Sequence, residues 1–281
     1  HSRELIRQAG QYCVNVYEHD FEVEEATFAT LPAVKESSVP AGGHLEGHRI
    51  GFDAGGSDRK VSAVVDGKTI YSEEVVWFPK TNEDPKYHYD GIYTAMKTAA
   101  EKMGNKIDAI GVSSAGVYID NKIMVASLFV KVPKDLFEKH VKYMYIDIAK
   151  QLEKEVGHPI PLEVANDGDV TALAGAMELK DTNVLGIAMG TSEAAGYVDS
   201  NGNLTGWLNE LAFVPVDFNK DAMVDEWSLD YGCGVKYFSQ DSVIKLAPAA
   251  NIELDPSLSP AEKLKVVQKL SEQDDPRAHQ I

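Results

Sequence analysis

The stretch RIGFDAGGSDRKVSAVVDGKTIY, from Arg49 to Tyr71, decides the fold. An apolar run leads to Asp53, and the small residues Gly55, Gly56 and Ser57 follow. A second run then alternates apolar and polar residues, which predicts a β-hairpin with the glycines at its tip. A hairpin needs turn glycines, but it does not need an aspartate on the strand just before them. The aspartate therefore points to chemistry at this tip.

The tip has the composition of a phosphate-binding loop. Glycine permits positive φ and close approach of the backbone to a ligand, and successive N–H groups form a nest for an anion. Ser57 adds a hydroxyl donor. Because Asp53 would repel a phosphate directly, we expect it to hold the Mg²⁺ of a nucleotide complex, directly or through water. The alternative is a plain hairpin turn with an exposed aspartate.

The overall composition is that of a soluble globular protein with one or two domains. The 281 residues are 44% hydrophobic and 25% charged, and no stretch approaches the roughly 20 apolar residues of a membrane span. The net charge of −17 argues against nucleic-acid or membrane partners, which require clustered Lys and Arg. Cys13 and Cys233 form neither a disulfide framework nor a CxxC pair, so we expect a cytoplasmic protein.

The order of predicted elements indicates a duplicated architecture. Residues 1–48 read as a short amphipathic helix and an extended arm, for which a homodimer contact is one interpretation. Residues 49–180 read as three strands, then helix, strand, helix, strand and helix, which is a mixed α/β domain. Residues 181–281 begin the same pattern again, in TNVLGIAMGTSEAAGYVDSNGNLTGW, but lack the later strands. We therefore expect two related domains with a cleft between them, the second incomplete in this chain.

Two further segments resemble parts of a phosphoryl-transfer site. The second hairpin tip, GTSEAAG, offers Gly190 and Thr191 as a second phosphate nest, with an ordinary polar turn as the alternative. In VANDGD, Asn166 and Asp167 come at the end of a buried strand, where ligands of α/β folds gather. Asp167 could take the proton of a substrate hydroxyl and Asn166 could bind the same substrate. A helix N-cap is the alternative for this pair.

Two candidates for a hydroxyl-binding pocket complete the set. The segment VSSAG follows an apolar strand, and its small residues leave room for a ligand beside Ser114 and Gly116. The alternative is a tight turn from strand to loop. Glu210, in GWLNELAF, could accept a hydrogen bond from a hydroxyl group, although an isolated glutamate is also common on a solvated surface.

These motifs, in this order, resemble the ROK family of sugar kinases, from about Arg49 to about Ala247. IGFDAGGS is similar to the family's first phosphate motif, DxGGT, with Ser57 in place of the threonine. DAIGVSSAGVYID is similar to the sugar loop, VANDGDVTALAGAMEL to the segment with the catalytic aspartate, and IAMGTSEAAGYVDSNGNL to the second phosphate motif. NELAF stands at the place of the ExGH motif.

The resemblance implies two ribonuclease-H-like (actin-like ATPase) domains and a kinase that phosphorylates a hexose or related sugar. It implies ATP and Mg²⁺ as cofactors, a small sugar as the partner, and Asp167 as the general base. The implied sugar ligands are Asn166, Ser114, Gly116 and Glu210. The implied nucleotide site consists of Asp53, which holds Mg²⁺ through water, with Gly55, Gly56, Ser57, Gly190 and Thr191 around the phosphates.

The chain also departs from the family pattern. Phe213 stands where ExGH has histidine, and only Cys233 remains of the zinc loop, so we predict no zinc. Ser192 and Ala194 replace glycines of the second phosphate motif, which would strain the loop if those positions need positive φ. These departures leave two other functions open: a non-catalytic protein that binds sugar or nucleotide, and a phosphohydrolase or sensor on the same fold.

Overall fold

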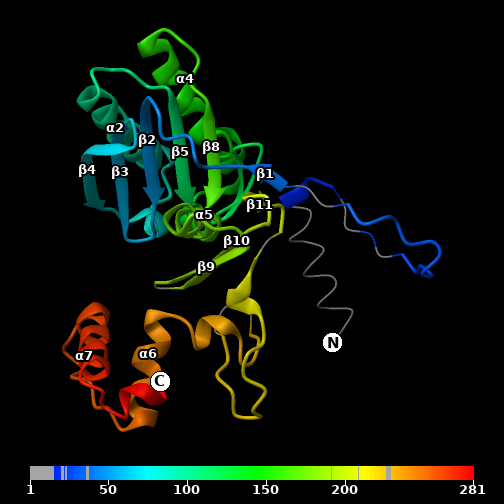
Figure 1. Ribbon diagram of the computed structural model, residues 1–281, viewed down its shortest axis with the longest axis vertical. Helices are drawn as coiled ribbons and strands as arrows, with labels where there is room; N and C mark the ends of the chain where they lie inside the picture. Colours follow the sequence, from blue (N-terminus) through cyan, green and yellow to red (C-terminus); the bar gives the residue numbers. More distant parts are fainter. Residues whose placement is uncertain are drawn as a thin grey trace. The chain divides into compact units, whose positions relative to one another are not determined.

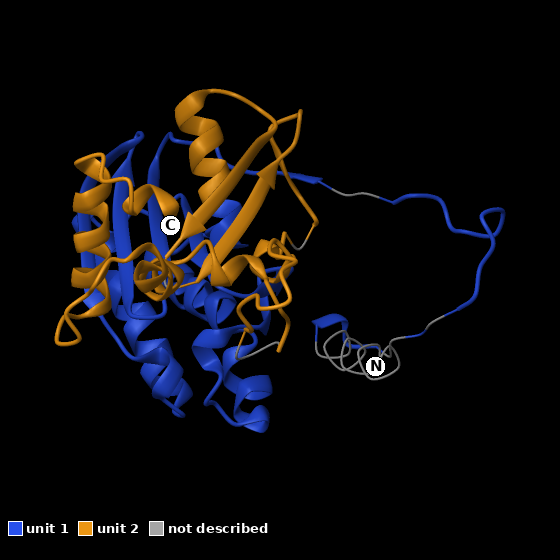
Figure 2. Ribbon diagram, turned by 90° about the horizontal axis from the view of Figure 1, so that it is seen from below, with its two compact units in different colours: residues 1–170 blue, residues 171–281 orange. Residues whose placement is uncertain are grey.

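The structure is a computed structural model that describes residues 16–19, 22, 24–35, 38–190, 192–207, 209–225 and 229–281 (Figure 1). The amphipathic helix predicted near the N-terminus lies largely outside these residues. The chain divides into two compact units, residues 1–170 and 171–281 (Figure 2). None of the helices in the described ranges has the length and hydropathy needed to cross a bilayer.

The first unit is built on a five-stranded sheet with the order β4-β3-β2-β5-β8. The expected three-strand meander is present, since β2, β3 and β4 pair antiparallel. β5 and β8 then continue the sheet parallel to β2. The strands of this unit are β1 (Ser38–Pro40), β2 (His48–Ala54), β3 (Asp58–Val65), β4 (Lys68–Val76), β5 (Ala109–Ser114), β6 (Val117–Ile119), β7 (Lys122–Val125) and β8 (Leu162–Asn166).

Two helices form the core of this unit with one face of the sheet. α2 (Pro85–Lys102) contacts β2, β3 and β4, and α4 (Met144–Val156) contacts β8 and α2. The alternate residues Ile50, Phe52 and Ala54 of β2 are buried in this core. Residues between them, such as Asp53, point to the opposite face of the sheet because side chains alternate along a strand.

Residues 133–157, which form the second helix expected in the first domain, are not one continuous helix. The structure has a short α3 (Lys134–Leu136), a π-helix η3 (Phe137–Val141) and then α4. The Lys142 N–H donates to the Phe137 carbonyl, which closes the wider turn, and the Lys142 carbonyl accepts from Ile123 N–H. Two 3-10 turns complete the unit, η1 (Pro79–Thr81) and η2 (Ser127–Phe129).

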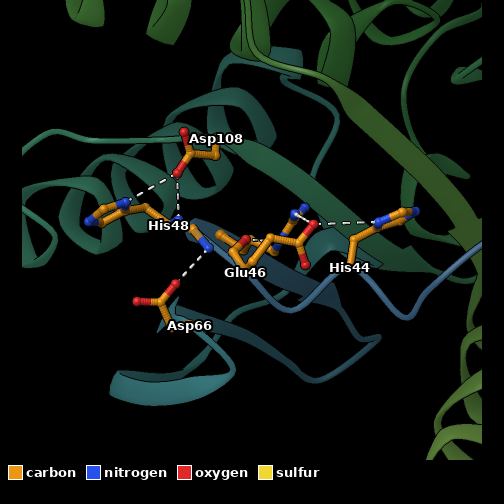
Figure 3. Close-up of polar contacts among 7 residues, drawn as sticks. His44, Glu46, His48, Asp66 and Asp108 are labelled. Atoms are coloured by element: carbon orange, nitrogen blue, oxygen red, sulfur yellow. Dashed lines mark hydrogen bonds and ion pairs between the residues drawn. The ribbon is translucent and has the colours of Figure 1, made fainter.

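The arm joins the domain at the start of β2 through two carboxylates (Figure 3). Gly47 N–H donates to Asp66 at 2.9 Å. His48 N–H donates to Asp108 at 2.6 Å, and the His48 ring nitrogen Nδ1 lies 3.1 Å from the same carboxylate oxygen. These contacts lie at the end of β2 opposite to Asp53, and residues 1–48 fall in the same compact unit as the sheet, so a separate N-terminal domain stays a prediction.

The second unit contains a small antiparallel sheet in which β10 (Glu193–Val198) pairs with β9 (Val184–Met189) and β11 (Asn203–Thr205). α5 (Asp167–Leu179) crosses the division between the units. Ala172 and Ala176 of α5 pack against Val198, and this explains why the division precedes residue 180. The remaining elements are η4 (Leu211–Phe213), η5 (Gly234–Lys236), α6 (Gln240–Leu246), η6 (Ala247–Ala250), α7 (Pro260–Glu272) and η7 (Ala278–Gln280).

Candidate functional site

The predicted catalytic segment lies at the carboxyl edge of the first unit's sheet. The parallel strands β2, β5 and β8 are in register there, since Ala54 pairs with Ser114 and Ser114 with Asn166. α5 begins at the next residue, Asp167. In α/β folds this edge is where ligands bind. The sheet thus brings the first phosphate loop, the small-residue loop and the predicted base to one edge.

Asp167, the predicted base, is a half-buried carboxylate. Burial raises its pKa, and the charge of Asp53 raises it further, while the backbone N–H of Gly168 and its own backbone N–H act in the opposite direction. Gly168 N–H lies 3.1 Å from Asp167 Oδ1. A carboxylate with a raised pKa is a better general base than a solvated one.

Asn166 links two segments at this edge through side-chain hydrogen bonds. Its Nδ2 donates to the Gly116 carbonyl at 2.9 Å, and its Oδ1 accepts from Gly168 N–H at 2.8 Å. The second contact is the one expected of the N-cap alternative. An Asn amide has two N–H donors and two acceptor lone pairs, so one of each stays open for a substrate hydroxyl beside these contacts.

Ser114 is fully buried, and its hydroxyl group is hydrogen-bonded to other side chains of the protein. Its Oγ accepts hydrogen bonds from Tyr118 Oη at 2.6 Å and from Tyr145 Oη at 3.1 Å. Tyr118 Oη also lies 3.1 Å from the Ala115 carbonyl. Burial raises the pKa of both tyrosines, so both hydroxyls remain protonated donors. A direct contact between Ser114 and a sugar stays a prediction.

Gly116 has a conformation that few other residues could adopt. Its φ is +138°, and a Cβ at this position would lie 2.4 Å from the Val125 carbonyl oxygen. A side chain here would therefore be strained and would clash with the backbone of β7. Glycine is required by the turn itself, whatever its part in sugar binding.

The first phosphate loop differs from its expected backbone. Neither Gly55 nor Gly56 has positive φ. Lack of a side chain matters at Gly55 for another reason, because a Cβ would lie 2.7 Å from the Asp58 carbonyl oxygen. Ser57 Oγ donates to Asp58 at 3.0 Å, and Trp77 Nε1 donates to the Gly55 carbonyl at 2.8 Å. The loop is thus a tight turn held by the buried indole of Trp77.

The second loop belongs to the second unit. Thr191 lies outside the described residues. Gly190 N–H donates to the Ser192 carbonyl, and the Gly190 carbonyl accepts from Gln240 N–H. Gly190, Ser192 and Ala194 are all absent from the positive-φ residues of the described chain. The strain expected from Ser192 and Ala194 is therefore not present, because these positions do not use the left-handed conformation.

Glu193 and Glu210 face different environments. Glu193 is 8% exposed, its Oε2 has no hydrogen-bond partner among the described residues, and burial raises its pKa. A Cβ on Gly234 would lie 2.5 Å from that Oε2, so Glu193 packs against η5. Glu210 is exposed and precedes η4, the turn that contains Phe213. The proximity of Glu210 to a sugar stays a prediction.

An ion pair lies beside the remnant of the zinc motif. Cys233 is buried, and burial raises the pKa of its thiol, as does the nearby charge of Asp225. Lys236 Nζ lies 3.2 Å from Asp225 Oδ1, and both side chains are 9% exposed. Within the described ranges, no three His, Cys, Asp or Glu side chains are grouped as metal ligands.

The donor set of the first unit is compatible with Mg²⁺ bound together with a nucleotide. Mg²⁺ prefers oxygen ligands, keeps several waters, and is commonly held by one or two carboxylates plus substrate phosphates. Asp53 and Asp167 are carboxylates near enough to interact electrostatically. A cation beside them would relieve this repulsion.

The sequence did not single out Trp77, Tyr118 and Tyr145 as site residues. Their roles depend on tertiary contacts with Gly55 and Ser114. The signal in the sequence was weak: one tryptophan after an alternating strand and two tyrosines in apolar segments, all typical of a core.

Comparison with known proteins gives the fold. No protein-family model and no curated protein matches the sequence. A ROK family glucokinase from Streptomyces griseus, solved with glucose and AMPPNP, matches with a TM-score of 0.58 and 20% identity over 83% of this chain and 73% of its own. A ROK hexokinase from Thermus thermophilus matches with a TM-score of 0.54 and 18% identity over 83% of this chain and 71% of its own.

The same fold also occurs in a regulator. A ROK family transcriptional regulator, a homologue of the E. coli MLC protein, matches with a TM-score of 0.52 and 15% identity over 73% of this chain and 50% of its own. The resemblance carried by the motifs is thereby confirmed at the level of the fold. The chain has the α/β fold of the ROK family sugar kinases.

Proposed function

We propose that this protein is a ROK family kinase that transfers the terminal phosphoryl group of ATP to a hydroxyl group of a hexose or related sugar. The observation that carries the proposal is the pair Asp53 and Asp167 at the carboxyl edge of the parallel strands, with the pKa of Asp167 raised. The similarity to sugar kinases supports the same reaction class.

Asp167 is the general base of this reaction. It accepts the proton of the sugar hydroxyl as the hydroxyl oxygen forms a bond to the γ-phosphorus. The bond from this phosphorus to the bridging oxygen breaks, and ADP leaves with the electron pair. Asn166 orients the hydroxyl with its remaining donor and acceptor. Ser114 and Gly116 shape the sugar loop, and Glu210 accepts a hydrogen bond from another hydroxyl.

The first loop and the second loop bind the phosphates. Gly55, Gly56 and Ser57 have this role in the first unit, and Gly190 and Thr191 have it in the second. The Ser57 hydroxyl donates to Asp58 and the Gly190 N–H donates to the Ser192 carbonyl, so each would exchange this partner for a phosphate oxygen. Asp53 would hold Mg²⁺ through water. When bound, this ion neutralises part of the charge on the phosphates.

The test is an ATP-dependent phosphorylation assay over a panel of hexoses and related polyols. Asp167→Asn keeps the shape of the side chain but cannot accept the proton, so we expect a loss of about 10²- to 10⁴-fold in kcat. Glu163→Gln, which changes an exposed carboxylate on the same strand β8, is the matched control and should keep the activity. Wild-type protein that turns over no sugar would refute the kinase.

A second candidate is a non-catalytic protein that binds sugar or nucleotide. Two observations favour it: the buried Glu193 in the second loop and the match to a transcriptional regulator. It predicts that wild type and Asp167→Asn bind the same sugar with equal affinity and that neither consumes ATP. Consumption of ATP without any acceptor would instead indicate a phosphohydrolase.

A further inference from the structure

The side chain of Lys80 lies over the first phosphate loop. A methyl group added at Gly56 would come within 3.0 Å of Lys80 Cε and 3.1 Å of Lys80 Nζ. Lys80 is an exposed residue in η1, 24 positions after Gly56 in the sequence, so the fold and not the local sequence creates this contact. We propose that the Lys80 ammonium group binds the phosphate chain of the nucleotide at Gly55–Ser57. The inference rests on the proposed kinase function.

The backbone that carries Lys80 is fixed to the loop itself. Trp77 is 2% exposed, and it donates from Nε1 to the Gly55 carbonyl at 2.8 Å and from its backbone N–H to the Ser57 carbonyl at 3.1 Å. Trp77 stands three residues before Lys80. Two hydrogen bonds from the buried Trp77 therefore join the loop to the segment that carries Lys80.

The same turn is fixed on its other side to α2. Pro79 is buried, and its carbonyl oxygen lies 3.1 Å from Nε2 of the fully buried His88. Tyr87 Oη accepts from Phe78 N–H at 2.9 Å. Because Trp77, Phe78 and Pro79 are held in this way, the backbone of Lys80 keeps its position and the ammonium group remains within reach of the loop.

Among the described cationic residues around the loop, Lys60 and Arg59 already have partners, whereas Lys80 is available. Lys60 is paired with Asp58 at 2.9 Å and is also influenced by Glu74 and Asp53. Arg59 donates from Nε to the Gly91 carbonyl and lies over the Trp77 ring. In the part of the chain that the structure describes, Lys80 makes no ion pair or hydrogen bond through its ammonium group.

The chemistry of an ammonium group suits this position. Lys carries three N–H donors and a compact charge, and lysine is a common point-charge ligand of phosphates. The surroundings otherwise contain the carboxylates Asp53 and Asp58, which repel a phosphate chain. A positive charge beside Gly56 would offset this repulsion and would stabilise charge that moves onto the leaving phosphate.

The experiment measures the binding of Mg²⁺-AMPPNP by calorimetry and the steady-state kinetics of sugar phosphorylation. Lys80→Ala should weaken AMPPNP binding by about ten- to a hundredfold, the range for a lost hydrogen bond to a charged group. Lys80→Arg should retain part of the affinity, and Lys80→Glu should lose more than Lys80→Ala. Lys86→Ala is the matched control, because Lys86 is exposed six residues further on and pairs with Asp90.

The outcomes separate this inference from the function on which it rests. If wild type binds AMPPNP and phosphorylates a sugar while Lys80→Ala does both equally well, Lys80 has no phosphate role and the kinase stands. If wild type binds no AMPPNP, the proposed function fails and the role of Lys80 fails with it. Equal unfolding midpoints of wild type and Lys80→Ala would show that a loss of affinity is not a loss of fold.

Discussion

Asp53, near the end of β2, lies close enough to Asp167, at the start of α5, for its charge to act on that carboxyl group. Burial is the larger cause of the raised pKa of Asp167, and the Asp53 charge adds to it. Two carboxylates on one edge of a sheet repel each other unless a cation or a proton intervenes. This relationship is the one we expect if Asp167 is the general base and Asp53 holds the Mg²⁺ of a nucleotide, as proposed above.

The first prediction concerns the pH dependence of kcat/KM. Only ionised Asp167 can accept the proton, so activity should be present above its raised pKa and should fall about tenfold per pH unit below it. Asp53→Asn removes the negative charge that raises the pKa of Asp167. The fall of kcat/KM at acidic pH, the acid limb of the profile, should therefore begin at a lower pH, even if the maximal rate drops. Asp90→Asn, on the exposed side of α2, should leave the limb in place. An acid limb unchanged in Asp53→Asn would contradict the electrostatic coupling.

The second prediction concerns Trp77. Trp77→Phe keeps a ring but leaves the Gly55 carbonyl without its indole donor, and it also leaves a small cavity. We expect a loss of about 1–3 kcal/mol in the free energy of unfolding, measured by urea denaturation, together with weaker nucleotide binding. Trp207→Phe is the control, since Trp207 is 53% exposed and stacks on Tyr197. Equal stability of Trp77→Phe and wild type would show that the indole does not hold the loop.

Much of the first unit could be predicted from the sequence because its elements have local signals. The alternation in residues 49–76 predicted the meander. Glycine, which commonly ends helices, follows the C-cap of α2 at Gly104 and caps α4 at Gly157. The position of Asp167 at a strand end also followed from a local pattern, a buried strand and then a helix.

The side-chain contacts that define the candidate site could not be predicted in the same way. The contact between Lys80 and Gly56 depends on how β4 and η1 return toward the loop, and no periodic pattern encodes it. The same holds for Ser114. Its small neighbours predicted a serine open to a sugar, but its hydroxyl group accepts hydrogen bonds from two tyrosine hydroxyls. Tertiary contacts decide where such side chains point.

The third prediction separates a structural from a sugar-binding role of Ser114. Ser114→Ala removes the acceptor of the Tyr145 hydroxyl, so a buried donor is left without its partner at a cost of about 1–3 kcal/mol in stability. Adding Tyr145→Phe removes that donor and should restore much of the stability. Ser113→Ala, the adjacent and less buried serine, should have little effect. A raised KM for sugar that Tyr145→Phe does not reverse would instead assign Ser114 to the sugar pocket.

The last prediction concerns the ion pair that lies beside Cys233. Asp225→Ala removes the carboxylate that lies 3.2 Å from the buried Lys236 ammonium group, and removing one member of a buried ion pair typically costs about 3–5 kcal/mol. The double variant Asp225→Leu with Lys236→Met removes both charges and should recover most of that loss, because well-packed apolar residues replace buried ion pairs at little cost. If the pair and not a metal stabilises this loop, a zinc chelator will leave the thermal midpoint of wild type unchanged. Stoichiometric zinc in the purified protein, or a lower midpoint with chelator, would show that this loop still depends on a metal.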